Sequence, residues 1–286
     1  MCLKISNGLD MQEIKFTKMH GTGNDFVVID CINQNITDRK QLAVNMCARR
    51  FGIGADQLIL ICPSEKADYL MEIYNPDGSN VEMCGNALRA VALYIKNRLG
   101  DTSPSYRIDT LGGLTVAETC DDMVTVNMGA PGFTPESIGL TEPREFTNTS
   151  YTFAENVTRD ITCVSMGNPH CVQFVENTEK CPLEIEGPLI ENHPLFKNRT
   201  NVEFVQVISD KEVNMRVWER GTGETLACGS GACAVAVACM KTGKTAREVS
   251  INLRGGTLKV SWNEADNSVY MTGPATFVYD GIWKVS

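Results

Sequence analysis

Two cysteines combine a reactive side chain with a local sequence that starts a helix. Cys84 opens the run CGNALRA and Cys228 opens the run CGSGACA, so each thiol is followed by small or helix-capping residues. We therefore expect both thiols at helix N-termini. There the helix dipole and the free backbone N–H groups favour negative charge, which predicts thiol pKa values below the ordinary value of about 8.5. The same N–H groups can bind a carboxylate.

A matched pair of thiols suits the inversion of a stereocentre. Inversion removes a proton from one face of a carbon atom and returns a proton to the opposite face. Each group must act as a base in one direction and as an acid in the other, so the two groups should be chemically alike. Cys84 and Cys228 meet that requirement. The helix N–H groups can also stabilise the charge that develops when the α-carbon of a bound amino acid loses its proton.

The chain repeats itself with an offset of 144 residues, which is the separation of the two cysteines. Cys84-Gly85 falls on Cys228-Gly229, and Gly112-Gly113 comes within one residue of Gly255-Gly256. Other coincident pairs are Asn24 with Asn168, Tyr74 with Trp218, Asn75 with Glu219, and Gly129 with Gly273. Such a repeat indicates two similar structural units. We expect an N-terminal lobe over residues 12–131 and a C-terminal lobe over residues 132–275, with residues 276–286 packing back on the first lobe.

The segments that follow the two cysteines predict the architecture of each lobe. Residues 87–95 read ALRAVALYI and residues 232–240 read ACAVAVACM, so each should form a helix that is buried on nearly all sides. The surrounding segments are rich in β-formers and several alternate with period two, among them FVVID, YLMEIY, EFVQV, MRVW and LKVSW. The pattern predicts an α+β fold in which a curved, mainly antiparallel sheet wraps around a central apolar helix in each lobe. The active site is then expected in the cleft between the lobes.

Composition excludes several classes of protein. Of the 286 residues, 43% are hydrophobic and 21% are charged, which is typical of a globular protein. A net charge of −9 argues against a nucleic-acid partner, which requires a basic surface. No run approaches the roughly 18 apolar residues of a membrane span, and Met1 to Glu13 lack the apolar stretch of a signal peptide. A cytoplasmic location is therefore expected, with Met11 as an alternative start and residues 1–10 as an extension.

Most of the twelve cysteines are expected to be buried hydrophobic residues. No C-x-x-C pair occurs, which argues against a zinc site, and a chain of this length does not need a disulfide framework. Among the basic residues, Arg49, Arg50 and Arg89 are expected to form ordinary salt bridges rather than to bind substrate.

Taken together, these stretches resemble the diaminopimelate epimerases. The resemblance runs from about residue 14 to residue 275 and rests on MHGTGNDFVVID, RRFGIGADQLI, YNPDGSNVEMCGNALRA, TLGG, VSMGNPHCVQFV, RTNVEF and WERGTGETLACGSGAC. It implies interconversion of LL- and meso-2,6-diaminopimelate in lysine and peptidoglycan precursor synthesis, without pyridoxal phosphate or a metal, and it alone implies a homodimer. One departure is Ala87, where many relatives carry glycine.

The resemblance also implies roles for individual residues. Cys84 and Cys228 match the acid/base pair. The backbone amides of Gly85-Asn86 and Gly229-Ser230 would hold the carboxylate at the reacting centre, and His170 would support the thiols. The side chains matching the substrate site are Asn24, Gln57, Asn75, Asn168, Asn201, Glu219 and Arg220. Their chemistry agrees, since an arginine grips a carboxylate with two hydrogen bonds and a glutamate accepts from an ammonium group.

Two other functions stay open. A histidine racemase or another two-thiol amino-acid racemase could keep the same frame and change the pocket that holds the rest of the substrate. A non-catalytic amino-acid-binding protein or thiol switch is the alternative from a different class. If the lobes close, Cys84 and Cys228 could also form an S–S bond of about 2.05 Å. Air oxidation would then inactivate the protein.

Overall fold

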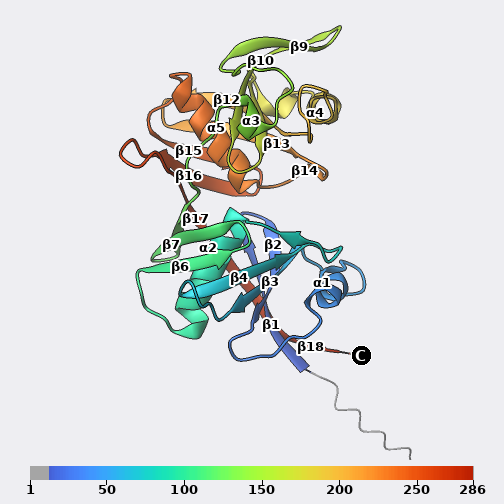
Figure 1. Ribbon diagram of the computed structural model, residues 1–286, viewed down its shortest axis with the longest axis vertical. Coiled ribbons are helices and arrows are strands. Elements are labelled where there is room, and N and C mark those ends of the chain that lie inside the picture. The colour runs from blue at the N-terminus through green and yellow to red at the C-terminus, as the bar shows by residue number, and fades with distance from the viewer. Residues whose placement is uncertain (1–12, 286) are drawn as a thin grey trace, which may run out of the picture.

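Figure 1 shows a computed structural model whose two lobes are stacked along the long axis of the molecule. The structure describes residues 13–285, so the proposed extension over residues 1–10 and the alternative start at Met11 lie outside the described residues. Within the described range, no helix is both long enough and apolar enough to cross a membrane.

The N-terminal lobe contains the first eight strands and the last one. These strands are β1 (Glu13–Gly21), β2 (Asn24–Asp30), β3 (Gln57–Cys62), β4 (Tyr69–Tyr74), β5 (Asn80–Val81), β6 (Ser105–Thr110), β7 (Gly113–Cys120), β8 (Met123–Asn127) and β18 (Thr276–Lys284). The helices are α1 (Arg39–Cys47), α2 (Gly85–Tyr94) and the short π-helix η1 (Ile95–Leu99). The end of the chain returns to this lobe because β18 pairs antiparallel with β1.

The C-terminal lobe contains the intervening strands. These are β9 (Thr149–Ala154), β10 (Val157–Ser165), β11 (Pro169–Phe174), β12 (Asn201–Ser209), β13 (Glu212–Glu219), β14 (Gly223–Glu224), β15 (Glu248–Leu253), β16 (Gly256–Trp262) and β17 (Val269–Pro274). The helices are α3 (Pro135–Ile138), η2 (Thr178–Lys180), α4 (Leu183–Glu191) and α5 (Gly229–Lys241).

Strand register confirms the internal duplication. In the N-terminal lobe Leu58 of β3 pairs with Tyr74 of β4, and in the C-terminal lobe Val202 of β12 pairs with Trp218 of β13. The two pairs are separated by the same 144 residues as the two cysteines. The starts of α1 and α4, and those of α2 and α5, are separated by that offset too.

The sheets are mainly antiparallel, as predicted, but the sequence did not reveal their parallel pairs. In the described part of the chain β2 runs parallel to β3 and β4 to β6, and their counterparts β11 with β12 and β13 with β15 do the same. A parallel pair needs a crossover connection, which is commonly a helix. Here α1, α2, α4 and α5 lie in those four connections, so the crossovers determine where both cysteine-bearing helices start.

The two lobes are joined through β8 and β17. These strands pair antiparallel, with Val126 opposite Met271 and Asn127 opposite Tyr270. Because residue 126 corresponds to residue 270 and residue 127 to residue 271 in the repeat, the contact is related to itself by a pseudo-twofold axis. The junction is therefore formed by equivalent strands of the two lobes.

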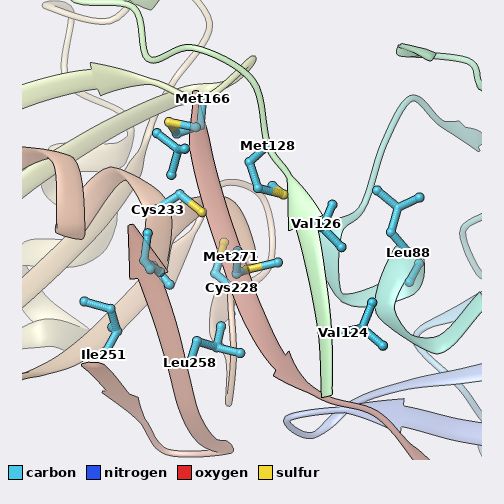
Figure 2. Packing of buried hydrophobic residues seen from close by; sticks show 14 of the residues in the cluster. Leu88, Val124, Val126, Met128, Met166, Cys228, Cys233, Ile251, Leu258 and Met271 are labelled. Carbon is cyan, nitrogen blue, oxygen red and sulfur yellow. The ribbon is translucent and has the colours of Figure 1, made fainter. Parts of the chain in front are cut away.

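The predicted central helices are confirmed as the core of the protein. Every residue of α2 from Gly85 to Leu93 is buried, and so is every residue of α5 from Gly231 to Cys239. Figure 2 shows Leu88 of α2 and Cys233 of α5 on opposite sides of β8 and β17, with Met128 and Met271 between them. Both cysteine-bearing helices are thus packed on the strands that join the lobes.

Candidate active site

Both reactive thiols lie at helix N-termini, as the sequence predicts. Cys84 is the N-cap of α2 with φ −143° and ψ 113°, and Cys228 is the N-cap of α5 with φ −120° and ψ 112°. The glycine after each thiol sits in a tightly packed position, because a Cβ at Gly85 would lie 2.7 Å from Met271 Cε and one at Gly229 would lie 3.2 Å from Asn86 Oδ1. The two thiols line one cleft between the lobes, with a volume of about 1540 Å³.

The cleft brings together most of the residues that the sequence singles out. Those that line it are Asn24, Gln57, Asn75, Cys84, Gly85, Asn86, Asn168, Glu219, Arg220, Cys228, Gly229 and Ser230. The two that do not line it are His170 and Asn201, which are buried behind it. Pockets for drug-sized ligands usually occupy about 300–1,000 Å³. The cleft is therefore larger than a small amino acid needs.

Amide groups surround the thiol of the N-terminal lobe. The Cys84 sulfur lies 3.7 Å from Asn24 Oδ1, which also accepts a hydrogen bond of 3.2 Å from Asn86 Nδ2. Burial raises the pKa of Cys84 above its ordinary value, whereas the N–H groups of Ala87 and Asn86 and the charge of Arg89 lower it.

Arg89 does not form the salt bridge expected from the sequence. It is fully buried, and among the described residues no carboxylate contacts it. Its Nε donates to the Pro274 carbonyl at 3.2 Å, and its Nη2 donates to the Thr22 hydroxyl at 3.3 Å. Because burial disfavours the charged form, the pKa of Arg89 falls to about 10. Arg49 behaves as expected, since it forms an ion pair with Asp25 at 2.8 Å.

Carboxyl groups surround the thiol of the C-terminal lobe. The Cys228 sulfur lies 3.6 Å from the Ser230 hydroxyl. Burial and the nearby Glu219 and Glu203 raise the pKa of Cys228 well above its ordinary value, and the Ser230 hydroxyl and the Gly231 N–H group act in the opposite direction.

The prediction that both thiol pKa values lie below the ordinary value is therefore wrong for this structure. The N–H groups lower the pKa values of Cys84 and Cys228 as expected, but desolvation is the larger effect at both sites. Burial disfavours the thiolate because the charged form loses its hydration.

Two polar groups in the cleft lack a strong partner and are free to meet a ligand. Gln57 Oε1 is buried without a hydrogen-bond partner, while Gln57 Nε2 donates to Asn75 Oδ1 at 3.4 Å. The Arg220 guanidinium donates to the Asn198 carbonyl at 3.3 Å, and no ion pair within residues 13–285 includes it. A buried acceptor without a donor calls for a donor from a ligand, and a guanidinium without a carboxylate can bind one.

Glu219 lies beside Cys228 and is held by the Thr225 hydroxyl, which donates to it. Burial raises the pKa of Glu219 above its ordinary value, and the hydrogen bonds from Thr225 and Cys228 lower it. The side chain can therefore accept a hydrogen bond from an ammonium group that enters the cleft.

His170 and Asn201 act behind the surface of the cleft. Asn201 Oδ1 accepts a hydrogen bond of 2.9 Å from the backbone of Arg220, which fixes the start of the arginine loop. His170 Nε2 lies 2.9 Å from Asn168 Oδ1, and His170 Nδ1 lies 2.6 Å from Glu203 Oε1.

Two charged residues of the site were missed by sequence reasoning. Glu203 is fully buried on β12, and Arg254 lines the cleft and forms an ion pair of 3.0 Å with Glu224. A lone glutamate inside the apolar run NVEFVQV was the available signal for Glu203, and the Gly-Gly pair after Arg254 was the available signal for a residue at a turn.

In the described part of the chain, no group of three or more histidine, cysteine or acidic residues is arranged to hold a metal ion. The thiols of Cys84 and Cys228 are both free. What the geometry offers is a pair of thiols at two helix N-termini, with donors for a carboxylate and acceptors for an ammonium group.

Comparison with solved structures establishes the fold. A phenazine biosynthesis protein of the PhzF family from Bacillus anthracis superposes with a TM-score of 0.70 at 16% identity, over 96% of this chain and 100% of that chain. A hydroxyproline epimerase from Agrobacterium vitis superposes with a TM-score of 0.66 at 16% identity, over 96% of this chain and 93% of that chain. At this level of identity the likeness extends to the two-lobed fold.

Sequence comparison goes further. The diaminopimelate epimerase of Acetivibrio thermocellus is 46% identical over 273 residues, covering 94% of this chain and 98% of that protein. Diaminopimelate epimerase 1 of a Nostoc species is 47% identical over 279 residues, covering 94% of this chain and 99% of that protein. A family model described as diaminopimelate epimerase matches residues 16–134 and 162–278, which include both cysteine motifs. The chain belongs to the diaminopimelate epimerase family.

Proposed function

We propose that the chain interconverts LL- and meso-2,6-diaminopimelate by passing protons between the substrate α-carbon and two thiols, Cys84 and Cys228. The observation that carries the proposal is the placement of these two thiols at equivalent helix N-termini on opposite lobes, facing one cleft. The product serves lysine and peptidoglycan precursor synthesis.

In each turnover one cysteine acts as a thiolate and the other as a thiol. The thiolate accepts the α-hydrogen as a proton and becomes a thiol, while the electron pair of the broken C–H bond is delocalised toward the α-carboxylate. The second cysteine donates its proton to the opposite face of the α-carbon and becomes a thiolate. The charge of the pair is unchanged, and the two roles are exchanged at the end.

The α-carboxylate is bound between the two helix N-termini. The first backbone N–H groups of α2 and α5, which have no partner within a helix, belong to residues that line the cleft: Gly85 and Asn86 on one side, and Gly229 and Ser230 on the other. Such groups bind a carboxylate and stabilise the negative charge that grows on it as the proton leaves.

Side chains of both lobes recognise the rest of the substrate. Arg220 supplies a guanidinium for the distal carboxylate, with the amides of Asn75 and Asn168 lining the same cleft. Asn201 completes this set by holding the backbone of Arg220. Glu219, Gln57 and Asn24 supply acceptors for ammonium groups. A substrate with two amino-acid head groups uses all of these contacts, whereas histidine or proline leaves the distal set without a partner.

Closure of the lobes completes the site. The cleft is larger than the substrate needs. Bringing α2 and α5 together would place the thiols on opposite faces of one carbon atom and exclude water, which strengthens the electrostatic stabilisation of the reacting carboxylate.

Incubation of the reduced protein with LL-diaminopimelate in D₂O tests the function. We expect deuterium at the α-carbon together with the meso product, observed by NMR. Absence of exchange with diaminopimelate, followed by exchange with histidine or proline, would assign a different racemase activity. Absence of exchange with every amino acid tried would leave a binding protein.

Assembly, location and lobe boundaries are parts of the same proposal. We propose a homodimer in the cytoplasm, with lobes over residues 12–131 and 132–275 and residues 276–286 on the first lobe. The long connection between β8 and β9, which contains α3, supports a boundary near residue 131.

A further inference from the structure

Glu203 is a buried carboxyl group that the proposed reaction does not yet use. It lies on β12 between the apolar residues Val202 and Phe204, and it is fully buried. Its Oε1 lies 2.6 Å from His170 Nδ1, and its Oε2 has no hydrogen-bond partner. Burial raises the pKa of Glu203 above its ordinary value. A buried carboxyl group is costly unless it is neutral or paired, so its retention here needs a reason.

A continuous row of side chains leads from Glu203 to a reactive thiol. His170 Nε2 lies 2.9 Å from Asn168 Oδ1, and Asn168 Nδ2 donates to the Ser230 hydroxyl oxygen at 3.3 Å. The Ser230 oxygen in turn lies 3.6 Å from the Cys228 sulfur. The row begins at Glu203 in the core and ends at Cys228, which lines the cleft.

The hydrogen on His170 Nε2 determines which group donates and which accepts in each hydrogen bond of the row. Asn168 Oδ1 can only accept, so His170 Nε2 must carry a hydrogen. Because Asn168 Nδ2 then donates to Ser230, the Ser230 hydroxyl hydrogen is free to point at Cys228. If His170 carried its hydrogen on Nδ1 alone, the Asn168 amide would turn over. The Ser230 hydroxyl would then donate to Asn168 and leave Cys228 without that donor.

We propose that Glu203 is a positioning residue that, through His170 and Asn168, aims the Ser230 hydroxyl at the Cys228 sulfur. Glu203 and His170 share one proton, and either location of it between Oε1 and Nδ1 keeps a hydrogen on Nε2. The Ser230 hydroxyl then stabilises the Cys228 thiolate, as a donor to a charged acceptor does.

The groups around Cys228 explain why such a donor is needed there. The negative charge of Glu219 on β13 opposes ionisation of this thiol, and an unpaired Glu203 carboxylate on β12 would do the same. Sharing a proton with His170 of β11 keeps the Glu203 pair neutral as a whole. Glu203 therefore orders the donor without adding a net charge beside the thiolate.

The N-terminal lobe provides an internal comparison. In the repeat, Phe26 is equivalent to His170 and Ile59 is equivalent to Glu203. Phe26 and Ile59 are buried and apolar. The row thus serves only Cys228, which is the thiol with carboxyl neighbours.

Two substitutions of equal size separate positioning from packing. Glu203→Gln keeps a donor for His170 Nδ1, whereas Glu203→Met fills the same space without one. The readout is the pH dependence of iodoacetamide alkylation at the Cys228 peptide, measured by mass spectrometry in reduced protein without substrate. We expect the alkylation midpoint to stay nearly unchanged in E203Q and to rise by about one pH unit in E203M. Equal midpoints in the three proteins, or a fall in both variants, would overturn the proposal, since a fall would mean that Glu203 acts as a charge.

Ser230 links the measurement to the row. We expect Ser230→Ala to raise the Cys228 midpoint by a similar amount, and Glu203→Met to add nothing further in the Ser230→Ala background, as a double-mutant cycle measures. If the two substitutions shifted the Cys228 midpoint independently, Glu203 would not act through Ser230. The Cys84 midpoint in the same samples is the matched control and should not move.

A measurement on the unaltered protein covers the case in which E203M does not fold. With only three histidines in the chain, ¹⁵N-labelled histidine gives resolvable NMR signals. We expect the His170 signal to show a hydrogen on Nε2, and a bare Nε2 would overturn the proposal. The role in catalysis rests on the proposed function, but neither the alkylation nor the NMR readout uses a substrate. Failure of the epimerase assay is therefore distinguishable from failure of this row.

Discussion

The two reactive thiols occupy equivalent positions in the duplicated fold but opposite electrostatic surroundings. Cys84 has amide neighbours and the buried cation Arg89 nearby, whereas Cys228 has the carboxyl groups of Glu219 and Glu203. In the repeat, Arg89 corresponds to Cys233 and not to another cation. The duplication has kept the helix starts that place the thiols and has changed the charges behind them.

This comparison shows that geometric symmetry does not require equal acidity. Inversion needs one thiolate and one thiol in every turnover, and a difference between the free thiols favours one of the two arrangements. The neighbours favour ionisation of Cys84 over that of Cys228.

The largest expected effect comes from removing either thiol. Cys84→Ser and Cys228→Ser should each lower the rate of inversion on the order of 10³-fold, because a hydroxyl does not ionise near neutral pH and general acid or base catalysis at one face is lost. Deuterium incorporation and product configuration, followed together by NMR, measure this. If one variant still inverted the substrate at a wild-type rate, the two-base arrangement would be wrong.

Loss of the buried cation should affect only one lobe. Arg89→Met is expected to raise the pKa of Cys84 by about one unit and to lower kcat about tenfold, since a positive charge that favours the thiolate is removed. Alkylation midpoints of both cysteine peptides measure the effect, with the Cys228 midpoint as the control. Arg89→Lys keeps the charge and should recover part of the shift. A shift of equal size at both thiols would show that Arg89 acts on overall packing.

The pH profile should report the raised pKa values of both thiols. Near neutral pH the free protein holds mainly two thiols, because burial raises the pKa values of Cys84 and Cys228. The fraction with one thiolate, and with it kcat/KM, should therefore rise up to tenfold per pH unit on the way to the first pKa. It should fall only above the second pKa, when both thiols are ionised. A profile that is flat from pH 6 to pH 9 would contradict the raised values.

Oxidation tests how closely the lobes approach. If closure brings Cys84 and Cys228 together, a thiol oxidant such as diamide should inactivate the protein, and dithiothreitol should restore activity. Peptide mapping would identify the bond. Full activity after oxidation, with no change in titratable thiols on reduction, would show that the two sulfurs do not meet.

The smallest effect is expected from a neutral substitution beside Cys228. Glu219→Gln should lower the alkylation midpoint of Cys228 by less than about one pH unit, since one of its two carboxyl neighbours is removed. The Cys84 midpoint should change less, because Glu219 is the weakest of the influences on that thiol. Equal shifts at both thiols would weaken the contrast between the lobes.

The sequence was sufficient to predict the repeat and the two buried helices, which follow from local patterns such as Cys-Gly before an apolar run and the common offset of 144 residues. The side chains of the substrate site were predicted from the resemblance to the diaminopimelate epimerases. The parallel strand pairs were not predictable, because period-two alternation does not tell parallel from antiparallel pairing.

The roles of Arg89 and Glu203 could not be predicted for a different reason. Each is one charged residue inside an apolar segment, and its partners come from distant parts of the chain, such as Pro274 for Arg89 and His170 for Glu203. The predicted lowering of the thiol pKa values was wrong for the same reason. The effect of a helix N-terminus is local and visible in sequence, but the desolvation that outweighs it depends on how both lobes pack.

The pairing of β8 with β17 gives the molecule the geometry of a dimer within a single chain. Val126 meets Met271, and the equivalent residues Tyr270 and Asn127 meet in turn, as in an isologous interface between two identical subunits. In a true homodimer every substitution appears twice, so a charge placed behind one thiol is also placed behind the other. Fusion of the two halves removes that restriction. A single gene can then give one half an arginine and the other a buried glutamate while the shared interface keeps the two reactive groups opposed.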